Sequence, residues 1–133
     1  MFSLLLLCRE PLPHREEGWR LDLGPVRIEP SPPTLMLGAM GDALGIRPAQ
    51  VIRFLCPSFS AALVAEGVAD VIGRATRGVL IDDATLAVLE DYEHERRLDP
   101  QELNSELVEL EQELDREADT NPLLWERVAQ SAG

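Results

Sequence analysis

Residues 40–55 read MGDALGIRPAQVIRFL, and the conformation of this stretch decides how the middle of the chain is built. Gly45 separates two short apolar segments, and Pro48 stands where a second helix would have its first turn. The apolar residues recur at the spacing of two helices packed across a glycine turn, namely Met40, Leu44, Ile46, Val51 and Phe54. We therefore expect one short helix over residues 34–45 and a second over residues 48–56.

The helical pattern continues toward the C-terminus. Ser58 precedes a longer segment with an apolar stripe, which predicts a helix that is capped by Ser58 and ends at a left-handed Gly78. Residues 79–81 fit either a short strand or an extended linker. Residues 84–98 are expected to form a helix with one apolar face made of Leu86, Leu89 and Tyr92. The sequence DPQE at 99–102 predicts the start of a further helix.

Toward the N-terminus the pattern is that of strands. The run FSLLLLC at residues 2–8 predicts a strand buried on both faces. Residues 19–28 alternate around a Gly24-Pro25 break, which predicts a hairpin or a bent strand pair. The fold class expected is therefore α+β, with a small N-terminal hairpin or sheet, a mostly helical domain and an acidic helical C-terminal arm. The three regions expected are an N-terminal strand region (1–33), a three-helix core (34–81) and the acidic region (82–133).

Charge is distributed unevenly along the 133 residues. The chain contains twelve arginines and no lysine, and its net charge is −12. Residues 82–133 hold sixteen acidic residues and four arginines, so the whole net charge lies in that region. Such segregation indicates either a region with its own function or a well-solvated helical surface.

Few residues favour catalysis, and we expect a non-enzymatic protein without a cofactor or a metal. His94 follows Glu90 by four residues, which fits a helical ion pair better than a metal site. The sequence has no phosphate-binding GxxxxGK loop and no GxSxG nucleophile motif. Cys8 and Cys56 lie outside any metal-binding or redox spacing.

The opening stretch, aligned on Gly45, resembles the helix-turn-helix of bacterial repressors. The resemblance implies that Arg47 and Arg53 face the DNA groove, with Gln50 beside them for adenine or phosphate. Arg74 and Arg77 could add contacts to phosphate. Against this reading, the segment 34–81 carries a net charge of only +1 and adjoins the acidic region. A DNA-binding regulator or antitoxin is therefore the alternative function.

The first functional hypothesis is an adaptor, an inhibitor or an assembly component, of the kind found in phage-like or secretion assemblies, that docks on another protein through its acidic helices. Apolar anchors are expected at a leucine seam and a tryptophan, namely Leu103, Leu107, Leu110, Leu114 and Trp125. An acidic rim is expected at Glu106, Glu109, Glu113 and Glu117, which favours a partner with a basic surface, or self-association. The alternative is that the leucines close the protein's own core.

The N-terminal segment does not fit a targeting signal. Its apolar run covers only residues 2–8 and follows no basic residue, whereas a secretory signal needs a basic start and a longer apolar stretch. Such a run is also too short to cross a bilayer. We therefore expect a cytoplasmic protein that does not bind membranes.

Overall fold

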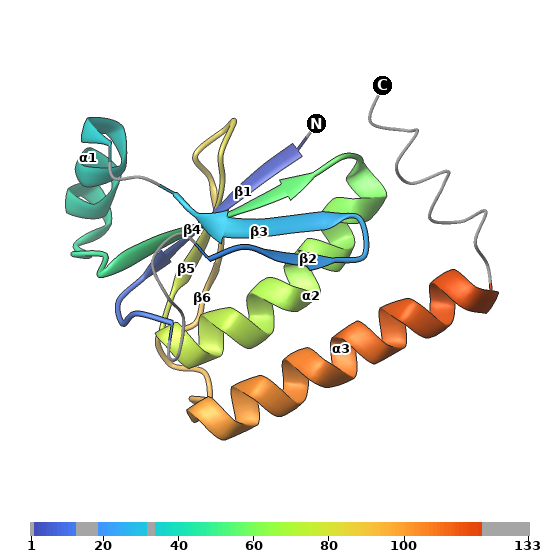
Figure 1. Ribbon diagram of the computed structural model, residues 1–133. Helices are drawn as coiled ribbons and strands as arrows, with labels where there is room; N and C mark the ends of the chain where they lie inside the picture. The colour runs from blue at the N-terminus through green and yellow to red at the C-terminus, as the bar shows by residue number, and fades with distance from the viewer. Residues whose placement is uncertain (1, 13–18, 32–33, 121–133) are drawn as a thin grey trace.

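Strand β1 (Phe2–Cys8) lies inside a six-stranded antiparallel sheet whose strand order is β2-β3-β4-β1-β5-β6 (Figure 1). The computed structural model describes residues 2–12, 19–31 and 34–120. The other strands there are β2 (Leu21–Leu23), β3 (Val26–Pro30), β4 (Gln50–Cys56), β5 (Val79–Asp82) and β6 (Val88–Asp91). The helices there are α1 (Leu35–Leu44), α2 (Phe59–Thr76) and α3 (Pro100–Thr120). The fold is mixed α+β, as the sequence predicts.

The leucine run of β1 is buried on both faces of the sheet. Leu5 pairs with Arg53 of β4 on one side and with Ile81 of β5 on the other. Leu4 and Leu6 belong to the core on the α2 side, whereas Leu5 and Leu7 belong to a second, smaller core. The predicted buried strand at residues 2–8 is therefore confirmed, and so is the hairpin of β2 and β3, which turns at Gly24 with φ 57°.

Helix α2 connects β4 to β5 and crosses over β1, so β4 and β5 run parallel with β1 between them. The helix begins as predicted, because the Ser58 hydroxyl accepts a hydrogen bond from the backbone N–H of Ala61 at 3.1 Å. Its alanines and valines pack on the sheet, and α3 lies alongside α2 (Figure 1). The two helices therefore form one layer over a single face of the sheet.

The predicted second helix over residues 48–56 is wrong, because these residues include strand β4. Gln50–Cys56 pairs with β1 along its whole length and with β3 on its other side. Ile52 and Phe54 are buried toward α2, whereas Val51 belongs to the smaller core. A short apolar run buried on both faces has no clear period, so a strand of this kind resembles a buried helix in sequence. The first half of the stretch does belong to a helix, α1, which ends at Leu44 and is followed by Gly45 with φ 70°.

The predicted helix over residues 84–98 is also wrong. Asp82 accepts hydrogen bonds from the backbone N–H groups of Ala84 and Thr85 at 2.8 and 3.0 Å, which forms a turn. The chain then returns as β6 and pairs with β5. Pairing with the edge of β5 outweighs the helical spacing of Leu86, Leu89 and Tyr92 in this segment.

The C-terminus of α2 differs from its prediction by one residue. Arg77, rather than Gly78, takes the left-handed conformation, with φ 52° and ψ 46°. Position 78 requires glycine for a different reason, because a Cβ there would lie 2.7 Å from the side chain of Leu6. Gly78 therefore lets the chain pass close to β1.

The two glycines of α2 give a matched test of this packing. A Cβ at Gly73 would overlap the ring of Tyr92, whereas a Cβ at Gly67 would meet nothing within 4 Å. We expect Gly73→Ala to lower the free energy of unfolding by about 1–3 kcal/mol, the usual cost of overpacking. Gly67→Ala should raise it by about 0.5–1 kcal/mol through helix propensity. Urea unfolding of both variants checks this, and an equal effect of the two substitutions would contradict the packing of Tyr92 on α2.

Candidate functional site

The leucine seam of α3 faces α2. Leu103, Leu107 and Leu114 are buried in the core, and Leu110 packs against it. Three of these leucines therefore pack in the protein's own core, as in the alternative that the sequence left open, and Leu110 stays partly exposed. Trp125, the other expected anchor, lies outside the described residues.

The carboxylates of α3 lie on its outer side. Glu109 and Glu113 are exposed and Glu106 is half-buried, and none of the three has an ion-pair partner in the part of the chain that the structure describes. The side chain of Glu117 lies outside the described residues. Near the start of the helix, Glu102 pairs with Arg96 at 2.8 Å, and its backbone N–H donates to the carboxylate of Asp99, as the DPQE motif predicts. The helix thus presents an acidic outer surface.

The arginines of the DNA-binding alternative lie on both sides of the sheet. Arg53 lies in β4 beside Glu29 of β3, on the sheet face opposite α2. Arg74 pairs with Asp70 on α2 at 3.3 Å, and Arg77 caps that helix. Because β4 replaces the second helix of the pair, Arg53 lies on the other side of the sheet from Arg74 and Arg77.

The remaining residues of that alternative, Arg47 and Gln50, line a cavity near the start of β4. A cavity of about 500 Å³ between α1 and the start of β4 is lined in part by Asp42, Arg47 and Gln50. The side-chain oxygen of Gln50 accepts a hydrogen bond from the backbone N–H of Leu12 at 3.0 Å, which fixes the amide at the cavity wall. Arg47 is exposed beside it.

A second hollow brings together carboxylates that are distant in sequence. It measures about 310 Å³ and lies between α2 and β6, with Glu66 and Asp70 on α2 and Glu90 on β6. Leu80, Leu89 and Tyr92 complete its lining. Asp70 is paired with Arg74, whereas Glu66 and Glu90 form no ion pair within residues 2–12, 19–31 and 34–120. We call these six residues the acidic hollow.

Tyr92 forms the buried wall of the acidic hollow. Its ring lies against the backbone of α2 at Gly73, and only 4% of the residue is exposed. Burial raises the pKa of the Tyr92 phenol above its ordinary value, and the negative charges of Asp70, Glu90 and Glu66 raise it further. The phenol therefore stays neutral at physiological pH, and the hollow carries the negative charge of its carboxylates alone.

The sequence did not predict this hollow. The spacing of Glu66, Asp70 and Arg74 at intervals of four residues in the sequence does place them on one exposed side of α2. Nothing in the pattern placed Glu90 beside them, because residues 84–98 were expected to be helical. A turn motif at Asp82 was the available signal for a hairpin, since aspartate favours such turns.

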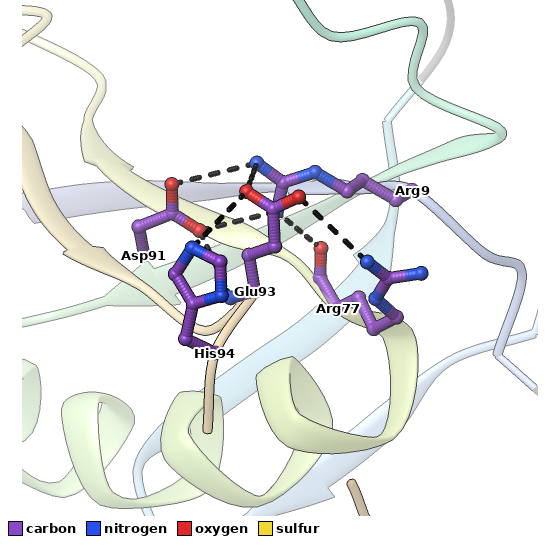
Figure 2. Close-up of polar contacts among 5 residues, drawn as sticks. All are labelled: Arg9, Arg77, Asp91, Glu93 and His94. Carbon is purple, nitrogen blue, oxygen red and sulfur yellow. Dashed lines mark hydrogen bonds and ion pairs between the residues drawn. The ribbon is translucent and has the colours of Figure 1, made fainter. Parts of the chain in front are cut away.

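On the other side of β6, a polar cluster holds the end of β1, the end of α2 and β6 together (Figure 2). Arg9 donates to the carbonyl oxygen of Arg77 at 2.8 Å and to the carboxylate of Asp91 at 3.1 and 3.4 Å. Glu93 lies 3.4 Å from Arg9 and 3.7 Å from Arg77. The bond from Arg9 lowers the pKa of the Asp91 carboxyl below its ordinary value.

The histidine and cysteines show no catalytic arrangement among the described residues. His94 lies 4.0 Å from Glu93, and the predicted pair with Glu90 is not formed. No group of three or more His, Cys, Asp or Glu residues in the described part could hold a metal ion. Both cysteines are buried, and burial raises the pKa of Cys8 to about 12 and that of Cys56 to about 11. Neither thiol is poised as a nucleophile.

Comparison with known proteins does not assign the chain to a family: no family model, no curated protein and no solved structure matches it. Among the described helices, none combines the length and the apolar character needed to cross a membrane.

The polar cluster predicts a specific loss of stability in acid. The pKa of Asp91 is lower in the folded chain than in the unfolded chain. The Asp91 carboxylate therefore stabilises the fold fully above its unfolded pKa of about 3.9, and this stabilisation is lost as the pH falls through the folded pKa. Asp91→Asn should therefore be less stable at neutral pH but lose less stability between about pH 5 and pH 3. Urea midpoints across this range measure the effect. Asp22→Asn is the control, since Asp22 pairs with Arg20 and Arg27, which are both exposed. Parallel curves for wild type and Asp91→Asn would refute the assignment.

The raised thiol pKa values predict that the folded protein resists thiol reagents. At about pH 8 an aromatic disulfide reagent should react with neither Cys8 nor Cys56, because both are buried and protonated. Two thiols per chain should react once guanidinium chloride unfolds the protein. Rapid labelling of either cysteine in the folded state would contradict the burial described here.

Proposed function

We propose that this protein is a non-enzymatic interaction protein that binds a partner protein with a basic surface. The observation that carries the proposal is the acidic hollow, in which Glu66 and Glu90 come together from α2 and β6 without a neutralising cation from the described chain. Both carboxylates line one hollow, so a cationic group that enters it would be attracted by both.

The exposed carboxylates of α3 support the same proposal in a different role. Glu109 and Glu113 lie on the surface, where charge pairs contribute little to affinity but attract an oppositely charged partner during encounter. The hollow is partly enclosed and contains apolar wall residues, Leu80 and Leu89, which suit the burial of an alkyl chain below a cationic head. We therefore assign the specific contact to the hollow and the steering to α3.

Two double variants with the same change in net charge test this assignment. Glu66→Gln/Glu90→Gln removes the unpaired charges of the hollow, and Glu109→Gln/Glu113→Gln removes two charges from α3. We expect the first to lower the affinity for the partner by about tenfold or more, mainly through faster dissociation. The second should mainly slow association and reduce its salt dependence.

The measurement begins with full-length protein as bait in extracts of the source cells, at low and at high salt. The basic protein that co-purifies is then identified and purified, and its binding rates are measured with wild type and both variants. A partner whose rates are unaffected by the hollow variant, or the absence of any basic partner at low salt, would refute the proposal.

A further inference from the structure

The outer side of β6 is an open edge of the sheet. The sheet ends at β6, and within the described ranges no strand pairs with its outer side. The backbone N–H of Tyr92 donates to the carbonyl oxygen of Gly78 at 2.9 Å. In an antiparallel pair, residues that are hydrogen-bonded to the partner strand alternate with residues that are not, and Asp91 is the next residue along β6, opposite Val79. Asp91 therefore directs its own N–H and C=O away from β5. The opposite edge, β2, differs because α3 packs beside it.

Exposed apolar side chains gather in the hairpin that forms this edge. Leu86, Val88 and Leu89 are 43%, 49% and 42% exposed. Single exposed apolar residues are ordinary, but three within four positions form a local patch. Leu86 also has φ 62°, a conformation that bulky residues rarely adopt. The hairpin thus presents apolar side chains and free backbone groups at the same place.

The two faces of β6 differ in chemistry. Glu90 pairs in register with Leu80 and points toward α2, where Glu90 and Leu89 line the acidic hollow. Val88 pairs with Ile81 and lies on the opposite face. A strand added to this edge would place alternate side chains over the hollow and beside Val88.

Charge decides which occupant fits this edge. A second copy of β6 would bring another Glu90 and Asp91 to an edge that is already acidic, and like charges across a strand pair are destabilising. A segment with basic side chains over the hollow would instead face Glu66 and Glu90. The carboxylates therefore oppose self-pairing and favour a basic strand.

We propose that β6 binds an extended segment of the partner protein as an added strand, in which lysine or arginine alternates with apolar residues. Main-chain hydrogen bonds to the edge supply affinity, the basic side chains enter the acidic hollow, and the apolar side chains cover Val88. This inference rests on the proposed function and specifies the part of the partner that is recognised.

A synthetic peptide tests the inference without knowledge of the partner. The probe is a blocked nine-residue peptide of alternating valine and lysine, and the readout is amide hydrogen exchange of the full-length wild-type protein followed by NMR. We expect the outward amide of Asp91 to exchange at least about tenfold more slowly with the peptide bound, as for a newly paired strand. Amides on the outer side of α3 should be unchanged. A peptide of alternating valine and glutamate should not bind.

Charge reversal at one position in the acidic hollow and at one position on α3 supplies the matched control. Glu90→Lys should weaken peptide binding by at least about tenfold, because it places a like charge at the hollow. Glu109→Lys, with the same change in charge on α3, should weaken it by less than about threefold. Circular dichroism verifies that both variants are folded, and the exchange readout on wild type does not depend on them.

The outcomes separate this inference from the proposed function. Slower exchange on α3 rather than β6, or capture of a basic partner by a chain that does not bind the peptide, overturns strand addition and leaves the proposed function intact. Protection of β6 that rises with protein concentration in the absence of peptide identifies a second copy as the occupant and also overturns it. If the wild-type protein binds neither the peptide nor a basic partner, both proposals are rejected.

Discussion

Strand β1 is hydrogen-bonded along both edges and buried on both faces, and the arrangement of every other element depends on this double burial. Leu4 and Leu6 must be shielded from water on one face of the sheet, and Leu5 and Leu7 on the other. Each buried leucine side chain contributes about 1.5–3 kcal/mol to the stability of the fold. Helix α2 covers the first face as it crosses from β4 to β5. Residues of the α1 region, Ile46 with Met40 beside it, help to cover the second.

The helices that pack on the sheet leave its β5–β6 end less enclosed. Helix α2 lies over β1 and its neighbours, with α3 on the flank nearer β2. The space between α2 and β6 is therefore filled only in part, by Tyr92 and Leu80, and it is bordered by carboxylates. The candidate site thus follows from where two helices can fit on a six-stranded sheet.

Sequence patterns predicted the elements that have one clear physical signature. The buried strand β1, the β2–β3 hairpin, the Ser58 cap and the start of α3 at DPQE all followed from local rules. Strands β4 and β6 could not be predicted in this way, because their apolar spacing also fits a helix and pairing with distant strands decides between the two. The acidic hollow depends on β6, so only its α2 half was recognisable from the sequence.

The position of β1 also constrains how the chain folds. Its register joins Phe2 to Cys56 and Leu4 to Asp82, so β1 pairs with two strands that lie far downstream in the sequence. Contacts of such long sequence separation slow folding, because a large loop must close before they form. During synthesis the leucines of β1 remain without their partners until β4, α2 and β5 have left the ribosome. A nascent chain therefore exposes this apolar segment until β5 has been synthesised, and that interval is when chaperones would act on it.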